Sequence, residues 1–276
     1  MQPLLSPPWI SFQRIGRFRP AIVEVMPITI DATQLETATA EEILELALRE
    51  FGSRFGIATS FQSEGQVLAH MATRIDPKAR VFTLDTGRLP AETYDLMATL
   101  RRDHGINVEI VYPDAAETEA MTTLYGINNF RDSSAQRKLC CQIRKVHPMN
   151  RKLAGMDAYA VGLRRTQSSE RADVPKAALD GKKWKFSPLA DWTFEQIEAY
   201  LAKHGVPEHP LVAKGFVSIG CAPCTRAIAP GEPERAGRWW WETDAGKECG
   251  LHATPSGQLK REMDVLLDQV RAAKPL

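Results

Sequence analysis

The sequence predicts an α/β protein with a mostly parallel sheet and helices on both faces. Two observations lead to this prediction. Short runs of β-type residues alternate with segments whose apolar residues recur at helical spacing, an order typical of parallel strands joined by covering helices. The chain has 276 residues, of which 43% are hydrophobic and 25% charged, so it is long enough and apolar enough to bury a sizeable core.

Five runs are predicted to be strands, the last of them a fifth strand or an edge. They are FGIATS (55–60), ARVFTLD (79–85), NVEIVYP (107–113), DAYAVGL (157–163) and KWKFSPL (183–189). The predicted helices lie in 37–51, 65–75, 90–105, 115–126, 192–205 and 256–273. Thr39 followed by Glu42 forms a capping-box pattern at the start of the first helix. Gly205 stands where a C-terminal cap is expected.

The chain is expected to divide into three parts. Residues 1–25 contain four prolines and scattered arginines and are expected to be a disordered tail, with Met26 as an alternative start. Residues 26–228 are expected to form the α/β nucleotide- and cluster-binding domain. Residues 229–276 form a C-terminal segment that packs on the same domain and carries the candidate nucleophile.

Net charge and apolar runs argue against several classes of protein. A net charge of +1 gives no general attraction to nucleic acid or to anionic membranes. No apolar run approaches the roughly 20 residues that span a bilayer, and the N-terminus lacks the apolar core of a secretory signal. We therefore expect a cytoplasmic protein with reduced cysteines, and no nucleic-acid or membrane partner.

Two predicted strand ends carry turns suited to nucleotide binding. TSFQSEG (59–65) joins a strand to a helix, whose free N–H groups favour an anion. LDTGRLP (84–90) ends the next strand. Local capping explains each turn equally well, and neither matches a standard nucleotide motif. Because ligands of open α/β sheets bind beyond the carboxyl ends of the strands, the two turns together favour a nucleotide crevice.

Four of the five cysteines form two pairs, Cys140-Cys141 and Cys221-x-x-Cys224. This pattern is typical of a four-thiolate metal site, which either zinc or an iron–sulfur cluster would accept. Adjacent cysteines are unusual for zinc, whereas each can take a different corner of a cubane cluster. The basic residues around the first pair also favour an anionic cluster: Arg137, Lys138, Arg144 and Lys145. Four unrelated buried thiols are the alternative.

Basic loops and a fifth cysteine complete the candidate site. GLRRTQSSER (162–171) contains three arginines, and GEPERAGRWWWE (231–242) places Arg235 and Arg238 one helical turn apart. Arginine binds phosphate-like oxygens through paired donors. A solvated basic surface is the usual explanation for a single arginine, but three basic clusters in loops at one end of the sheet would be unusual for a surface alone. Cys249 has glycine beside it and Lys247 and His252 nearby, a setting in which a thiol becomes nucleophilic. A surface cysteine without a role is the alternative.

Eight motifs together resemble the assimilatory adenylyl-sulfate reductases, relatives of the phosphoadenylyl-sulfate reductases. The resemblance extends from about residue 40 to residue 255 and is specific. Its motifs are SFQSEG, LDTGRLPAETY, Cys-Cys-x-x-Arg-Lys, GLRRTQSxxR, FSPLADWT, SIGCxPCTR, GExERAGRWWWE and KECGLH.

This resemblance implies an adenine nucleotide α-hydrolase-like fold in which SFQSEG is a degenerate pyrophosphate loop. It also implies a [4Fe–4S] cluster on Cys140, Cys141, Cys221 and Cys224. Members with both cysteine pairs generally use adenylyl sulfate. The implied substrate-binding residues are Ser60, Gln62, Ser63, Glu64, Gly65, Leu84, Asp85, Thr86, Gly87, Lys145, Arg164, Arg165, Arg171, Arg235, Arg238 and His252.

The resemblance further implies a reaction and a partner. Cys249 attacks the sulfur of adenosine 5′-phosphosulfate and becomes an S-sulfocysteine. Reduced thioredoxin, or a glutaredoxin-like dithiol, then releases sulfite, a step of sulfate assimilation and cysteine biosynthesis. A homo-oligomer is compatible with the sequence.

Three alternatives remain open at the level of sequence. A phosphoadenylyl-sulfate reductase has the same chemistry. A pyrophosphate-loop ATPase is disfavoured because SFQSEG lacks that loop's aspartate. A non-catalytic iron–sulfur redox sensor or nucleic-acid-binding regulator is disfavoured because the sequence has no basic stripe.

Overall fold

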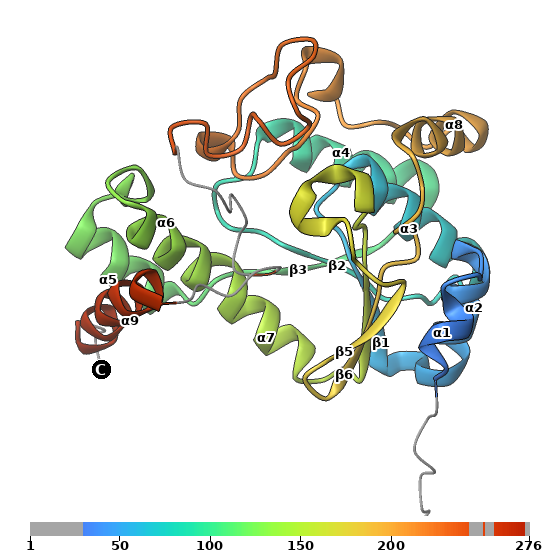
Figure 1. Ribbon diagram of the computed structural model, residues 1–276, viewed down its shortest axis with the longest axis horizontal. Coiled ribbons are helices and arrows are strands. Elements are labelled where there is room, and N and C mark those ends of the chain that lie inside the picture. The colour runs from blue at the N-terminus through green and yellow to red at the C-terminus, as the bar shows by residue number, and fades with distance from the viewer. Residues whose placement is uncertain (1–29, 243–250, 252–256, 274–276) are drawn as a thin grey trace, which may run out of the picture. The chain divides into compact units, whose positions relative to one another are not determined.

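Six strands form one sheet at the centre of the fold (Figure 1). The structure, a computed structural model, describes residues 30–242, 251 and 257–273. The strand order is β3-β2-β1-β4-β6-β5, and neighbours pair in parallel except for the antiparallel β5 and β6. The predicted fold class is therefore confirmed. The strands are β1 Phe55–Ala58, β2 Val81–Leu84, β3 Val108–Val111, β4 Ala158–Val161, β5 Ala177–Asp180 and β6 Lys183–Phe186.

Each of the five predicted runs contains one observed strand. KWKFSPL contains β6, which lies between β4 and β5 and so is not an edge of the sheet. The edge strand on this side of the sheet is β5, which was not predicted from the sequence. It is joined to β6 by a tight turn in which Gly181 has a φ of +63°, a conformation that glycine adopts without strain.

Helices cover both faces of the sheet. Figure 1 shows α7 on one side of the strands and α2 and α3 on the other, while α5, α6 and α9 pack together. Thr39 caps α2 with Glu42 in a capping box, and Gly205 ends α8, as predicted. The helices are α1 Ala32–Leu35, α2 Ala40–Phe51, α3 Ser63–Ile75, α4 Ala91–His104, α5 Ala115–Tyr125, α6 Ser134–Cys141, α7 His147–Leu153, α8 Phe194–His204 and α9 Gly257–Ala272.

Residues 134–153 form a helical segment that is not predicted from the sequence. Here α6 and α7 are joined by a π-helical turn, Gln142–Val146, so that the backbone stays helical from Ser134 to Leu153. The wide turn begins directly after Cys141. Such insertions occur often at functional sites, where they change the direction in which neighbouring side chains point.

Residues 206–242 have little regular structure, as predicted. They contain two short 3₁₀ turns, Val212–Lys214 and Ala222–Cys224, and an isolated antiparallel bridge between Thr225 and Arg238. Asp31–Leu276 form one compact unit, and the boundaries predicted after residues 25 and 228 stay predictions. In the described part of the chain, no helix has the length and apolar character needed to cross a membrane.

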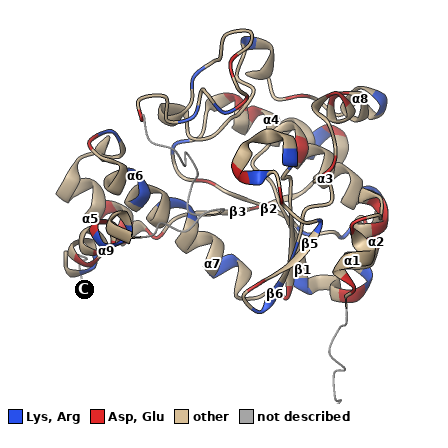
Figure 2. Cartoon of the chain, in the orientation of Figure 1, with Lys and Arg blue, Asp and Glu red and all other residues tan. Residues whose placement is uncertain are grey.

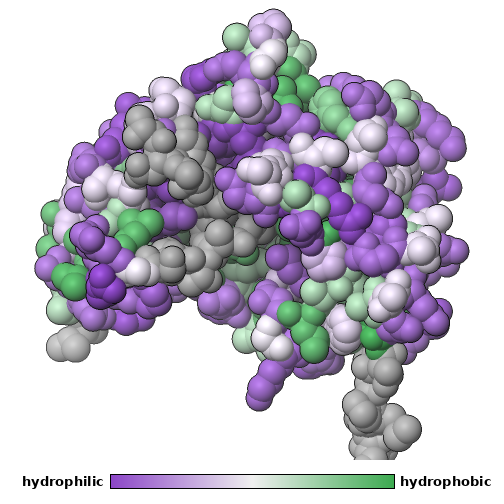
Figure 3. All heavy atoms as spheres, in the orientation of Figure 1, coloured by the Kyte–Doolittle hydropathy of each residue, from purple (hydrophilic) through white to green (hydrophobic). Residues whose placement is uncertain are grey.

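The surface is polar and mixed in charge. Figure 2 shows acidic and basic positions interspersed on α2 and α9, in keeping with the net charge of +1. The face seen in Figure 3 is largely hydrophilic, and its hydrophobic atoms form small separate groups.

A histidine cluster joins α3, α4 and α8. The His70 ring lies 6.2 Å from the ring of His104 and 5.4 Å from that of His204, centroid to centroid. His70 Nδ1 is 3.0 Å from the hydroxyl of Tyr200. Burial, with the charges of His204, Arg74 and His104, lowers the pKa of His70 to about 4.

This depressed pKa predicts a loss of stability in mild acid. Below the ordinary histidine pKa of about 6.5, the unfolded chain binds a proton that folded His70 does not accept, so the free energy of unfolding falls as pH drops from about 6.5 towards 4. Urea unfolding between pH 7 and pH 5 measures this. His70→Phe keeps the ring packing, and its stability should depend less steeply on pH. Equal slopes for the two proteins would contradict the prediction.

Candidate active site

A cavity opens at the carboxyl ends of β1, β2 and β4. Its lining includes Ser60 after β1, Leu84 at the end of β2, Thr86 just beyond it, and Gly162 after β4. The chain order reverses here, because β1 has β2 on one side and β4 on the other. Such a switch point is where open α/β sheets bind ligands.

The turn between β1 and α3 leaves the helix N-terminus open to the cavity. Phe61 has a φ of +59°, held by a hydrogen bond that its N–H donates to Thr59 Oγ1 at 3.0 Å. Gln62 occupies the N-cap position but makes no capping hydrogen bond. Its side chain instead accepts from Ile219 N and donates to Ser60 Oγ. The first amides of α3 are therefore left without a side-chain cap, as an anion site requires.

The turn after β2 connects the cavity to the cysteines. Asp85 is buried and accepts hydrogen bonds from Gly87 N at 2.8 Å and from the Tyr94 hydroxyl at 3.0 Å. Arg144 donates from Nη1 to the Thr86 carbonyl at 2.7 Å. Thr86 Oγ1 lies 3.2 Å from Cys221 Sγ. Hydrogen bonds to Asp85 and to the Thr86 carbonyl thus hold this turn in place.

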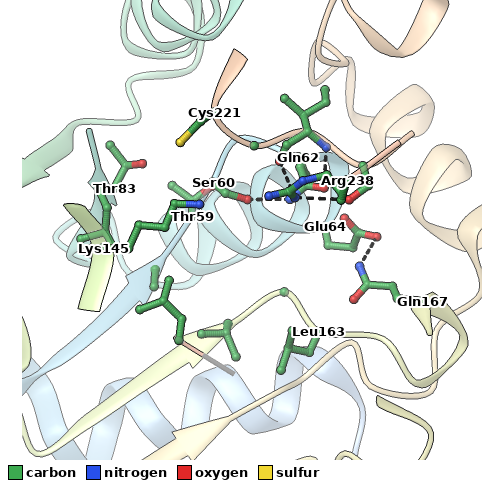
Figure 4. Close-up of a pocket in the computed structure, with 18 of the residues that line it drawn as sticks. Thr59, Ser60, Gln62, Glu64, Thr83, Lys145, Leu163, Gln167, Cys221 and Arg238 are labelled. Atoms are coloured by element: carbon green, nitrogen blue, oxygen red, sulfur yellow. Dashed lines mark hydrogen bonds between the residues drawn. The ribbon is translucent and has the colours of Figure 1, made fainter. Parts of the chain in front are cut away.

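Five basic side chains line the cavity: Lys145, Arg171, Lys185, Arg235 and Arg238. They come from the π-helical turn, from the loop after β4, from β6 and from the C-terminal loops. Figure 4 shows Lys145, Ser60 and Arg238 approaching the cavity from different elements. Together they give it the positive lining that an anionic ligand needs.

Arg164 is bound to carboxylates beneath this lining. It is 1% exposed and pairs through Nε with Glu64 at 2.7 Å and through Nη2 with Glu234 at 2.9 Å. Gln167 donates to the same Glu64 carboxylate at 2.9 Å. These contacts balance the negative charge of Glu64 and Glu234, the two glutamates that line the cavity. Arg164 therefore stabilises the lining without belonging to it.

The four paired cysteines lie in one buried cluster with Trp239 and Leu139. Cys140 and Cys141 end α6, and Cys221 and Cys224 border the 3₁₀ turn Ala222–Cys224. None of the four forms a disulfide.

The thiols differ in how readily they ionise. Burial and the neighbouring thiols Cys141 and Cys221 raise the pKa of Cys140 to about 12. Burial and Cys221 likewise raise the pKa of Cys224 to about 12. Burial also opposes ionisation of Cys221, but Lys145, Thr86 and Arg238 outweigh it and lower its pKa.

The cysteines fit a four-thiolate group in kind and number. Within the described residues, no set of three or more His, Cys, Asp or Glu side chains stands at metal-binding geometry. The four sulfurs nevertheless share one buried cluster and act on one another electrostatically. Thiolates are the ligands that iron–sulfur clusters and structural zinc both accept.

The predicted substrate residues divide into three groups. Cys249 and His252 lie outside the described residues. Nine line the cavity: Ser60, Gln62, Glu64, Leu84, Thr86, Lys145, Arg171, Arg235 and Arg238. Ser63, Gly65, Asp85, Gly87, Arg164 and Arg165 support the surrounding loops and are not among the lining residues.

Arg165 and Gly65 each have a clear partner, the first away from the cavity and the second in its lining residue Thr59. Arg165 donates to Glu36 at 2.6 Å. Gly65 packs so tightly on Thr59 that a Cβ would lie 2.5 Å from Oγ1. Lining residues that sequence reasoning missed include Thr83, Gln167, Ser218 and Gly220. Gln167, Ser218 and Gly220 stand inside the motifs singled out above, but their types alone gave no sign of a role.

Comparisons with known proteins identify the family of the chain. A family model described as the phosphoadenosine phosphosulfate reductase domain matches residues 54–227. An adenosine 5′-phosphosulfate reductase from Allochromatium vinosum is 43% identical over 227 residues, covering 82% of this chain and 88% of that protein. The chloroplastic 5′-adenylylsulfate reductase 3 of Arabidopsis thaliana is 40% identical over 244 residues, covering 84% of this chain and 52% of that protein.

A solved structure shares the fold. The phosphoadenylyl-sulfate reductase of Candida auris, crystallised as a phosphate complex, has a TM-score of 0.61 and 23% identity, covering 73% of this chain and 99% of that one.

Fold and site together define an α/β protein with a cavity rich in basic side chains beside buried thiols. The chain belongs to the phosphoadenosine phosphosulfate reductase family, as the sequence resemblance predicted. It is an oxidoreductase that acts on sulfur groups.

The position of Arg164 predicts a structural effect. Arg164→Ala leaves Glu64 buried and unpaired, so the free energy of unfolding should fall by about 3–5 kcal/mol. Arg49→Ala is the control, because its side chain is 67% exposed and its loss should cost about 0–1 kcal/mol. Urea unfolding measures both. Unchanged stability with weakened nucleotide binding would instead place Arg164 in contact with the ligand.

Proposed function

We propose that this protein reduces adenosine 5′-phosphosulfate to sulfite and AMP, in sulfate assimilation, with thioredoxin as the dithiol donor. The observation that carries the proposal is the similarity to adenosine 5′-phosphosulfate reductases at 40–48% identity. The cavity supports it, because an uncapped helix N-terminus and five basic side chains lie together at the sheet's switch point.

The basic side chains have a defined task in this reaction. The substrate carries negative charge on its phosphate and on its sulfuryl oxygens, and both repel an approaching thiolate. Lys145, Arg235 and Arg238 neutralise these oxygens, and α3 adds its N-terminal amides. Because the donors are already in place, little reorganisation is needed as charge moves onto the AMP leaving group.

Cys249 acts as the nucleophile. Its thiolate attacks the sulfur of the sulfuryl group, the bond from that sulfur to the phosphate oxygen breaks, and AMP leaves with the electron pair. A thioredoxin thiolate then attacks Cys249 Sγ and expels sulfite. The second thioredoxin thiol restores the Cys249 thiol, so the dithiol becomes a disulfide while sulfate-level sulfur becomes sulfite.

Leu251 supports this assignment. It lines the cavity and packs against hydrophobic residues on both sides of it. Two residues of extended chain span at most about 7 Å, so a nucleophile at position 249 is compatible with attack in this cavity.

Cys140, Cys141, Cys221 and Cys224 would hold a [4Fe–4S] cluster. When bound, such a cluster supplies negative charge that orients Lys145 and the neighbouring basic side chains. The positive charges of Arg144, Lys145 and Arg238 near Cys221 are suited to that charge. The expected cytoplasmic location stays a prediction.

Sulfite release from each nucleotide tests the proposal. With reduced thioredoxin, adenosine 5′-phosphosulfate should yield sulfite and AMP, and the 3′-phosphorylated nucleotide should be used less well. Iron analysis of the same preparation should give about four irons per chain. Turnover of the 3′-phosphorylated nucleotide alone would make the protein a phosphoadenylyl-sulfate reductase, and stoichiometric zinc without iron would indicate a structural metal site. No turnover of either nucleotide by iron-loaded protein would overturn the proposal.

A further inference from the structure

Arg238 is held in the cavity by packing. Its side chain is buried, and its guanidinium carbon lies 4.6 Å from the centroid of the Trp239 ring. On Gly220, a Cβ would lie 2.2 Å from Arg238 Nη2 and 2.5 Å from Cζ. The guanidinium therefore occupies the space that any larger residue at position 220 would fill.

The hydrogen bonds of Arg238 within the protein are long. Nη1 is 3.5 Å from Ser218 Oγ and 3.4 Å from the Ile219 carbonyl oxygen. Nε is buried without a hydrogen-bond partner among the described residues. Among the residues that the structure describes, no carboxylate forms an ion pair with Arg238, whereas Arg164 pairs with two glutamates. Its donors therefore remain available for an anionic ligand.

Trp239 is itself tightly fixed. Its ring is 1% exposed and stacks against a second arginine, Arg137, at 4.6 Å. Arg137 is anchored by a buried ion pair with Glu242 at 2.5 Å. Trp239 has a φ of +42°, a strained conformation for a bulky residue that the surrounding structure must maintain. Because Trp239 N also donates to the Cys224 carbonyl at 3.3 Å, the ring is tied to the turn that carries Cys221 and Cys224.

We propose that Gly220 and Trp239 are positioning residues that fix the guanidinium of Arg238 for the phosphosulfate group. An arginine side chain free in a cavity loses rotamer freedom when it binds a ligand. An arginine already fixed by a ring and by a backbone with no Cβ avoids that loss and presents its donors in one direction. The inference rests on the proposed function, because it takes the phosphosulfate as the ligand.

Gly220→Ala tests this most sharply. The new Cβ meets the far end of a flexible side chain, so the fold should persist while the guanidinium is displaced with its charge intact. Gly155→Ala is the matched control, because a Cβ there meets no atom within 4 Å. Binding is measured by calorimetry with adenosine 5′-phosphosulfate and with adenosine, in a Cys249→Ser background that prevents turnover. Iron content and thermal unfolding are compared across the variants.

Gly220→Ala should weaken binding of adenosine 5′-phosphosulfate about tenfold, the scale of a charge-assisted hydrogen bond, and change adenosine binding less than about twofold. In an Arg238→Ala background it should cause no further loss, because the displaced group is absent. Unchanged affinity, equal losses for both ligands, or full additivity with Arg238→Ala would overturn the inference. Absence of sulfite release by the unmutated protein would instead overturn the proposed function.

Trp239 provides an independent arm of the test. Trp239→Phe keeps an aromatic face for the guanidinium, so its affinity for adenosine 5′-phosphosulfate should stay within about threefold of the parent, whereas Trp239→Leu should lose about tenfold. Trp240→Leu is the control, since that ring packs on Trp241 and is 38% exposed. Equal losses for Phe and Leu would show that Trp239 acts only as a core residue.

Discussion

Repulsion between negative groups is the constraint on which this site depends. A thiolate must approach an anionic phosphosulfate, and four further thiols lie buried beside the same cavity. Ionisation of Cys140 and Cys224 is suppressed by burial and by their neighbours. Lys145 and Arg238 reduce both repulsions. They line the cavity in which the phosphosulfate would bind, and they also lower the pKa of Cys221. The same positive charges thus favour the substrate and a thiolate ligand set.

Three of the buried arginines, Arg137, Arg164 and Arg238, are held in two different ways. Arg137 and Arg164 form buried ion pairs with glutamates and stabilise the fold. Arg238 is held by a ring and a glycine, and its polar contacts are long. Burying a charge without a paired carboxylate is costly, and that cost is tolerated where a ligand of opposite charge completes the pairing. The division explains how one arginine-rich site is both stable and ready to bind an anion.

Sequence reasoning predicted the sheet because its signals are local. Each predicted run contains a strand, and the capping box of Thr39 and Glu42 is present. The antiparallel strand β5 was missed, since Ala177–Asp180 contains no β-branched or aromatic residue to indicate a strand. The helical run from Ser134 to Leu153 was missed because its apolar face packs on several elements and is interrupted by a π-helical turn. Nine of the predicted substrate residues line the cavity, but the pairing of Arg164 with Glu64, a hundred positions earlier, is a tertiary contact that spacing does not reveal. Gly220 could not be predicted from the sequence either, because its proposed role depends on the contact that a Cβ there would make with Arg238.

The account's central claim is that the substrate's sulfur is transferred to Cys249. It is tested most directly by mixing the iron-loaded protein with adenosine 5′-phosphosulfate in the absence of any dithiol and mapping the product by peptide mass spectrometry. The account predicts one sulfonate group on Cys249, none on the Cys249→Ser variant, and its removal as sulfite when reduced thioredoxin is added. Sulfite release without a sulfonate on Cys249, or a sulfonate that forms on another cysteine and is released from there, would contradict it.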